Sequence, residues 1–201
     1  MYSQILICAS FLVASYQDVR ERSVSDLVWL PALAGAGFAV VYSYPGVEFL
    51  AVKIALVGAI ALVFTLLGYI GQADGIAFAL IAADPYPPSP IPALFGAAVV
   101  ALTHIAYEFA TGNARGTLTI PISQFLKEQR WIPKAVIAQG TRTEVDGDVN
   151  VAREQVAAQP VEGSTVEVTY GVPTVAYLGL GYLAYVVYLL VFNTPAFFSL
   201  P

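Results

Sequence analysis

The chain has 201 residues, of which 58% are hydrophobic and 11% charged, and its mean hydropathy is +0.71. Soluble domains carry about 25% charged residues, so this composition excludes an ordinary soluble domain and indicates a membrane protein with several spans. Nine Lys and Arg without a basic run argue against nucleic-acid binding, and one cysteine and one histidine cannot supply a disulfide framework or a metal site.

Six apolar runs predict membrane helices. Five approach the roughly 17–25 residues that cross a bilayer: 2–16, 27–43, 49–70, 91–110 and 172–193. No Lys or Arg precedes the first run, which favours a retained span over a signal peptide. The sixth run, residues 75–83, is short and spans only by tilting or by recruiting the residues before it. If it is re-entrant, every later segment changes side.

The Lys and Arg residues predict the orientation of these spans. With six spans, residues 17–26 and 111–171 lie on one side and hold eight of the nine Lys and Arg. The ninth, Lys53, is expected to snorkel from the outer end of its helix. The positive-inside rule then makes the basic side cytoplasmic and places the N-terminus outside a multi-pass cell-membrane protein.

Residues 112–170 are the one soluble-looking block. Residues 130–138 and 164–170 have strand-type composition, residues 144–150 carry a turn signal and residues 151–159 suit a helix. We therefore expect an all-α polytopic membrane protein with six transmembrane helices and a small cytosolic α+β insert before the last one. The expected division is 1–111 with helices one to five, 112–170 as the insert, and 171–201 with the last helix.

Two acids stand where apolar runs end. Asp18 lies in "SYQDVRERS" after the first run, and Asp74 lies in "GYIGQADGIAF" after the third. The chain crosses outward on the second run and returns on the third, so both acids reach the cytoplasmic end of the bilayer. Two carboxylates in one poorly solvated place do not both ionise, which is what an aspartic protease requires. The small residues around Asp74 let helices or an extended substrate approach: Gly71, Ala73 and Gly75.

Other interpretations of the acids remain open. Each Asp is alternatively an interfacial cap, or a partner of Arg20 or Arg22. A small proton-coupled transporter or channel would use the pair as a relay, although both acids lie at one interface and no second-half repeat occurs. A scaffold homologue without activity is a further alternative. His104, among apolar residues, is expected to be a hydrogen-bonded packing histidine rather than a proton relay.

At these motifs the chain resembles a family. "DVRERSVSDLVW" is similar to the D-x-[KR]-x-R-x-[IV]-x-[DN] pattern of archaeal preflagellin and prepilin peptidases. "GQAD" resembles the G-x-G-D motif of the same intramembrane aspartyl proteases, a class that includes type IV prepilin peptidases and presenilin. "YGVPT" at 170–174 resembles the Gly-x-Pro stretch that opens their last span. Two positions depart from the pattern: Ala73 replaces the second Gly, and Thr174 stands where an aromatic residue is usual.

The resemblance implies a membrane-embedded aspartic endopeptidase with Asp18 and Asp74 as the catalytic residues. It implies substrate contacts at Gly71, Ala73, Gly75, Gly171 and Pro173, and no metal or organic cofactor. The expected partners are the lipid bilayer and an archaellin or type IV pilin-like precursor, which is cut between its basic leader and its hydrophobic helix. The sequence leaves open which precursor is processed and what the oligomeric state is.

Overall fold

The computed structural model describes residues 2–42, 47–67, 70–85, 91–112, 116–128, 130–146, 149–160 and 163–192. The chain forms two compact units. The helical unit comprises Met1–Asp18, Val24–Leu102 and Thr174–Pro201, and the sheet unit comprises Val19–Ser23 and Thr103–Pro173. The sheet unit therefore includes the end of the first helix and the last part of the apolar run at 91–110.

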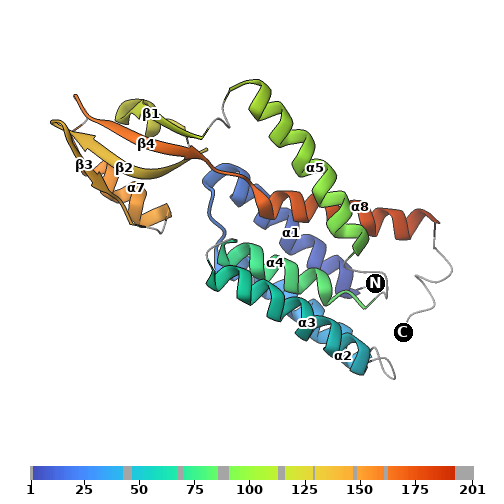
Figure 1. Ribbon diagram of the computed structural model, residues 1–201. Helices are drawn as coiled ribbons and strands as arrows, with labels where there is room; N and C mark the ends of the chain where they lie inside the picture. Colours follow the sequence, from blue (N-terminus) through green and yellow to red (C-terminus); the bar gives the residue numbers. More distant parts are fainter. Residues whose placement is uncertain are drawn as a thin grey trace. The chain divides into compact units, whose positions relative to one another are not determined.

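A helix forms in each of the six predicted apolar runs (Figure 1). The helices are α1 (Tyr2–Glu21), the short 3-10 helix η1 (Asp26–Trp29) continued by α2 (Leu30–Tyr42), α3 (Val47–Leu66), α4 (Gln72–Ala82), α5 (Ile91–Ala110) and α8 (Thr174–Phe192). Among the described residues, α3, α5 and α8 are long and apolar enough to cross a membrane, whereas Asp26–Tyr42 and α4 are shorter apolar helices. The count of six spans stays a prediction.

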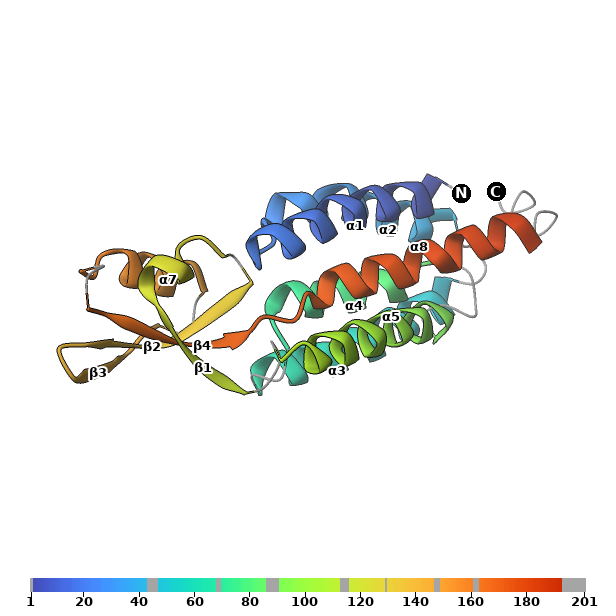
Figure 2. The ribbon, with the colours of Figure 1, turned by 90° about the horizontal axis from the view of Figure 1, so that it is seen from above.

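Helix α8 is the central helix of the helical unit (Figure 2). Just over half of its apolar window is buried (56%), whereas only 11% is buried in α3 and in α5. Glycines let neighbouring backbones approach it. A Cβ at Gly179 would lie 3.3 Å from the Phe11 carbonyl oxygen of α1, and a Cβ at Gly181 would overlap the backbone of Ala93 and Ala97 in α5.

The core of the helical unit and its outer surface are both apolar. Ile7, Phe11 and Ala14 recur at helical spacing on the inner face of α1, where the Phe11 ring lies 5.8 Å from Trp29 and 5.5 Å from Tyr182. Large apolar side chains also cover the outside of α3 and α5, with Leu56 62%, Phe95 72% and Leu102 69% exposed. An apolar exterior on long apolar helices is what a bilayer requires, so this is a membrane protein.

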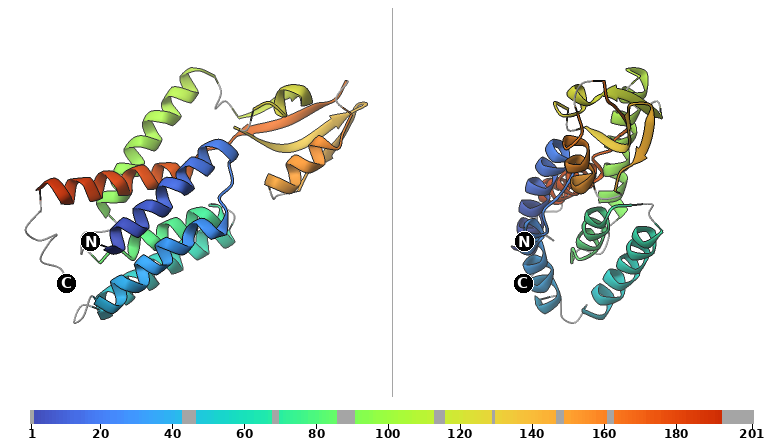
Figure 3. Two further views of the ribbon diagram at one scale, coloured as in Figure 1. Left: turned by 180° about the vertical axis from the view of Figure 1, so that it is seen from behind. Right: turned by 90° about the vertical axis from the view of Figure 1, so that its left-hand side faces the viewer.

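The sheet unit contains one antiparallel sheet with the strand order β1-β4-β2-β3. The strands are β1 (Thr117–Pro121), β2 (Trp131–Ala138), β3 (Thr141–Glu144) and β4 (Thr165–Tyr170); α6 (Ile122–Phe125) and α7 (Val149–Ala157) accompany them. Figure 3 shows α7 across one face of the sheet, where it packs on β2. Alternate strand residues and the two helices supply the core: Ile120, Ile122, Phe125, Trp131, Val136, Val156, Val166 and Val168.

The strands predicted at 130–138 and 164–170 and the helix predicted at 151–159 are present as β2, β4 and α7. The predicted turn at 144–150 lies partly outside the described residues, between the end of β3 and the start of α7. Strands β1 and β3 were not predicted.

Candidate active site

Asp18 lies in the last turn of α1 and is 7% exposed. Its Oδ2 accepts a hydrogen bond of 3.0 Å from the backbone N–H of Ala176. Ala176 belongs to the first turn of α8, whose N–H groups have no acceptor within their own helix. The carboxylate of α1 therefore caps the N-terminus of α8, and the positive end of the α8 dipole faces a group able to carry negative charge.

Asp74 lies in the first turn of α4, three residues after the N-cap Gly71. Its Oδ2 accepts a hydrogen bond of 3.0 Å from the Gly71 N–H, so the side chain folds back over the start of its own helix. A Cβ at Gly71 would lie 3.3 Å from that same oxygen. Glycine at position 71 thus leaves room for the carboxylate at the helix start.

The two carboxylates interact electrostatically, although they come from different helices. Asp18 is oriented by α8 and Asp74 by the start of α4, and α4 packs directly on α8. Small residues keep α4 close to its other neighbour as well, because a Cβ at Gly75 would lie 2.8 Å from Thr65 Oγ1 of α3. The structure thus brings together the two acids that the sequence singled out.

The model of the type IV leader peptidase family matches residues 5–106, just over half of the 201 residues. The chain belongs to the type IV leader peptidase family. No curated protein and no solved structure matches it.

Membership of the leader peptidase family indicates a peptidase and a prepilin-type substrate, and it does not favour the transporter alternative. The matched segment runs from α1 into α5, so it contains both Asp18 and Asp74. The four strands of the sheet, which begin at Thr117, lie outside the matched segment.

Gly171 and Pro173, the other two predicted substrate residues, lie just before the start of α8. Gly171 donates its N–H to the Arg130 carbonyl at 2.9 Å, and a Cβ there would lie 3.1 Å from that oxygen. This close contact between the end of β4 and the residue before β2 is itself a reason for glycine. Pro173 is buried and immediately precedes Thr174, the first residue of α8.

His104 has the packing contacts and the polar partner that were expected of it. Its Nε2 lies 3.3 Å from Glu108 Oε1 one turn further along α5, and its ring packs against Tyr170 with 6.3 Å between centroids. The Arg22 guanidinium lies 5.8 Å from the Tyr170 ring. Burial and the nearby Glu108 raise the pKa of the Tyr170 hydroxyl, while Arg22 opposes that rise.

A second polar cluster was not predicted from the sequence. Asp84 follows α4 and is fully buried. Tyr182 of α8 donates to Asp84 Oδ2 at 2.7 Å, and Lys53 Nζ donates to the Asp84 carbonyl at 2.5 Å. Lys53 was expected to snorkel from the outer end of its helix, and its ammonium reaches this carbonyl oxygen just beyond the end of α4. The sequence did contain a signal for this cluster, because Lys53 near the start of the run at 49–70 and Asp84 after the run at 75–83 are predicted on the same side of the membrane.

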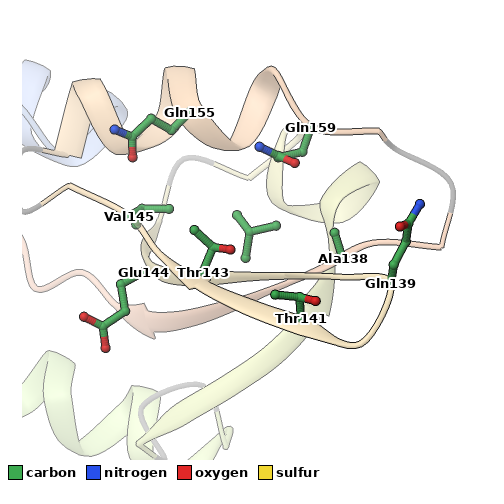
Figure 4. A pocket seen from close by; sticks show the side chains of 9 residues that line it. Ala138, Gln139, Thr141, Thr143, Glu144, Val145, Gln155 and Gln159 are labelled. Atoms are coloured by element: carbon green, nitrogen blue, oxygen red, sulfur yellow. The ribbon is translucent and has the colours of Figure 1, made fainter.

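The sheet unit has a separate cavity of about 440 Å³ beside the β2–β3 hairpin (Figure 4). Gln155 reaches it from α7 and Gln159 from the residues just after α7, and Thr143 and Glu144 reach it from β3. Glu144 is already paired with Arg142 at 3.0 Å. Among the described residues that line this cavity, Glu144 is the single acid, so they supply no second pair of carboxyl groups.

Proposed function

We propose that this protein is an aspartic endopeptidase that removes short leader peptides from archaellin or type IV pilin-like precursors. The observation that carries the proposal is the interaction of Asp18 with Asp74 across two helices, each oriented by a backbone N–H. Both acids lie within the segment that matches the leader peptidase family.

The chemistry follows from two carboxyl groups that share one proton. The ionised carboxylate takes a proton from a water molecule as the water oxygen attacks the carbon of the scissile peptide bond. The protonated carboxyl donates its proton to the carbonyl oxygen. When the tetrahedral intermediate collapses, the C–N bond breaks and a proton passes to the leaving nitrogen. No further reactant is needed.

A peptide bond at this site has to be extended, because a helical amide is already hydrogen-bonded within its own helix. A precursor with a charged leader and a hydrophobic helix exposes such a segment where its helix leaves the bilayer. Gly71 and Ala73 keep side chains small beside Asp74, which suits the approach of that strand, whereas the space at Gly75 is taken by Thr65 of α3. We place the acids and the sheet unit on the cytoplasmic side and the N-terminus outside, following the distribution of Lys and Arg.

The decisive experiment is cleavage by the purified protein in liposomes. A precursor is added, and the new N-terminus is determined by mass spectrometry. We expect one cut between the leader and the hydrophobic helix. The Asp18→Asn/Asp74→Asn double variant in the same liposomes is the control for contaminating proteases. An intact precursor, or solute flux without cleavage, would refute the peptidase and favour the relay alternative.

A further inference from the structure

We propose that Asp84 and Tyr182 are positioning residues that hold α4 in register along α8 and thereby align Asp74 with Asp18. The proposal rests on the proposed function. Helix α4 has an acid at each end, with Asp74 in its first turn and Asp84 two residues past its last. At about 1.5 Å per residue the two acids are roughly 15 Å apart along the helix, so Asp84 does not reach the peptide bond itself.

Helix α8 donates hydrogen bonds to Asp18 and to Asp84. Its first turn donates the Ala176 N–H to Asp18, and the Tyr182 hydroxyl donates to Asp84. One rigid helix therefore contacts the carboxylate of α1 and the far end of α4. Because α4 packs on α8, its lengthwise position sets where Asp74 stands relative to Asp18.

Apolar packing alone does not fix that lengthwise position. The buried face of α4 consists of Gly75, Ala77, Leu80, Ile81 and Ala82, whose apolar contacts have little directionality. A catalytic pair has to be held within about 0.5 Å of its working geometry. The hydrogen bond from Tyr182 is directional, and the Lys53 ammonium holds the Asp84 carbonyl from α3.

Burial makes this contact hard to break. Asp84 is fully buried, and a polar group at that depth is tolerated only with its hydrogen bonds made. Any slide of α4 along α8 would separate the Asp84 carboxyl from the Tyr182 hydroxyl. The end of α4 distant from Asp74 is thus the fixed point from which Asp74 is placed.

The first test uses Tyr182→Phe, which removes one hydroxyl and keeps the ring that packs on Phe11. We expect kcat for precursor cleavage to fall tenfold to about a hundredfold with KM within about twofold, because a displacement of about 1 Å is enough for such a loss. Tyr188→Phe is the matched control on the exposed side of the same helix and should leave kcat unchanged. Asp84→Asn keeps an acceptor for Tyr182 and should stay near the unaltered rate, whereas Asp84→Ala should behave like Tyr182→Phe. Equal loss in Asp84→Asn and Asp84→Ala would overturn the proposal.

The second test does not depend on cleavage. Cys8 is the one native cysteine, so spin labels on Gln72→Cys and Leu180→Cys in a Cys8→Ala background report the distance between α4 and α8. Tyr182→Phe should shift or broaden that distance by about 1 Å or more, and Tyr188→Phe should not. Unchanged distances with Tyr182→Phe would overturn the positioning role whatever the rate does. If even the unaltered protein leaves the precursor intact, the proposed function fails, and the label distances alone decide whether Tyr182 holds α4.

Discussion

Replacing Asp18 by Asn separates the two roles that this carboxylate can have. The Asn side-chain oxygen can still accept the hydrogen bond from Ala176, so the cap on α8 is preserved. The amide neither takes a proton from water nor shares one with Asp74. A residue that only caps a helix should tolerate the change, and a catalytic acid should not.

The magnitudes for the two roles are far apart. Because the hydrogen bond is kept, Asp18→Asn should change the free energy of unfolding by less than about 1 kcal/mol. Asp18→Ala leaves a buried N–H at the start of α8 without its carboxylate and should cost about 1–3 kcal/mol. The loss of cleavage in Asp18→Asn should be on the order of a thousandfold or more, which corresponds to about 4 kcal/mol of transition-state stabilisation.

The assay measures kcat/KM for a precursor in liposomes, with membrane insertion and thermal unfolding checked for every variant. Asp74→Asn should lose as much activity as Asp18→Asn, and the double variant should be little worse, because residues that act as a unit are not additive. Asp146→Asn makes the same chemical change at an exposed acid of the sheet unit and should cleave normally. Near-normal cleavage by either Asp18→Asn or Asp74→Asn would refute the catalytic pair and leave Asp18 as a helix cap.

Three further outcomes are expected. The rate of cleavage against pH should be bell-shaped, with apparent pKa values that belong to the pair, and a rate independent of pH would contradict a shared proton. Shortening the 146–150 turn should leave measurable cleavage, because neither acid belongs to the sheet unit; loss of turnover in a stably inserted protein would indicate substrate docking there. Gly179→Ala should lower the free energy of unfolding by about 1–3 kcal/mol, because the added Cβ collides with the Ser15 hydroxyl and lies 3.3 Å from the Phe11 carbonyl oxygen. Unchanged unfolding would show that α1 and α8 accommodate the added methyl group without cost.

The sequence by itself determined where the long apolar helices lie and singled out two acids at their ends. Apolar runs of near-span length can satisfy their backbone in lipid only as helices, and each of them is helical. Asp18 and Asp74 stand out because charges are scarce in such a chain. The strands over 131–138 and 165–170 were also predictable, because their alternating apolar residues form the core of the sheet unit.

Only the tertiary structure decided what depends on segments far apart in the chain. β3, Thr141–Glu144, consists of exposed residues and has no apolar pattern, and it is a strand because its backbone pairs with β2. The N–H that holds Asp18 comes from Ala176, 158 residues away, and no local pattern announces it. Asp84 reads as part of a polar connection, yet it is buried because Tyr182 of α8 and Lys53 of α3 meet it there. Burying a polar group costs free energy unless a hydrogen-bond partner offsets that cost. For Asp18 and Asp84 the partner lies on a helix far away in the sequence, so the contact exists only once the helices have packed.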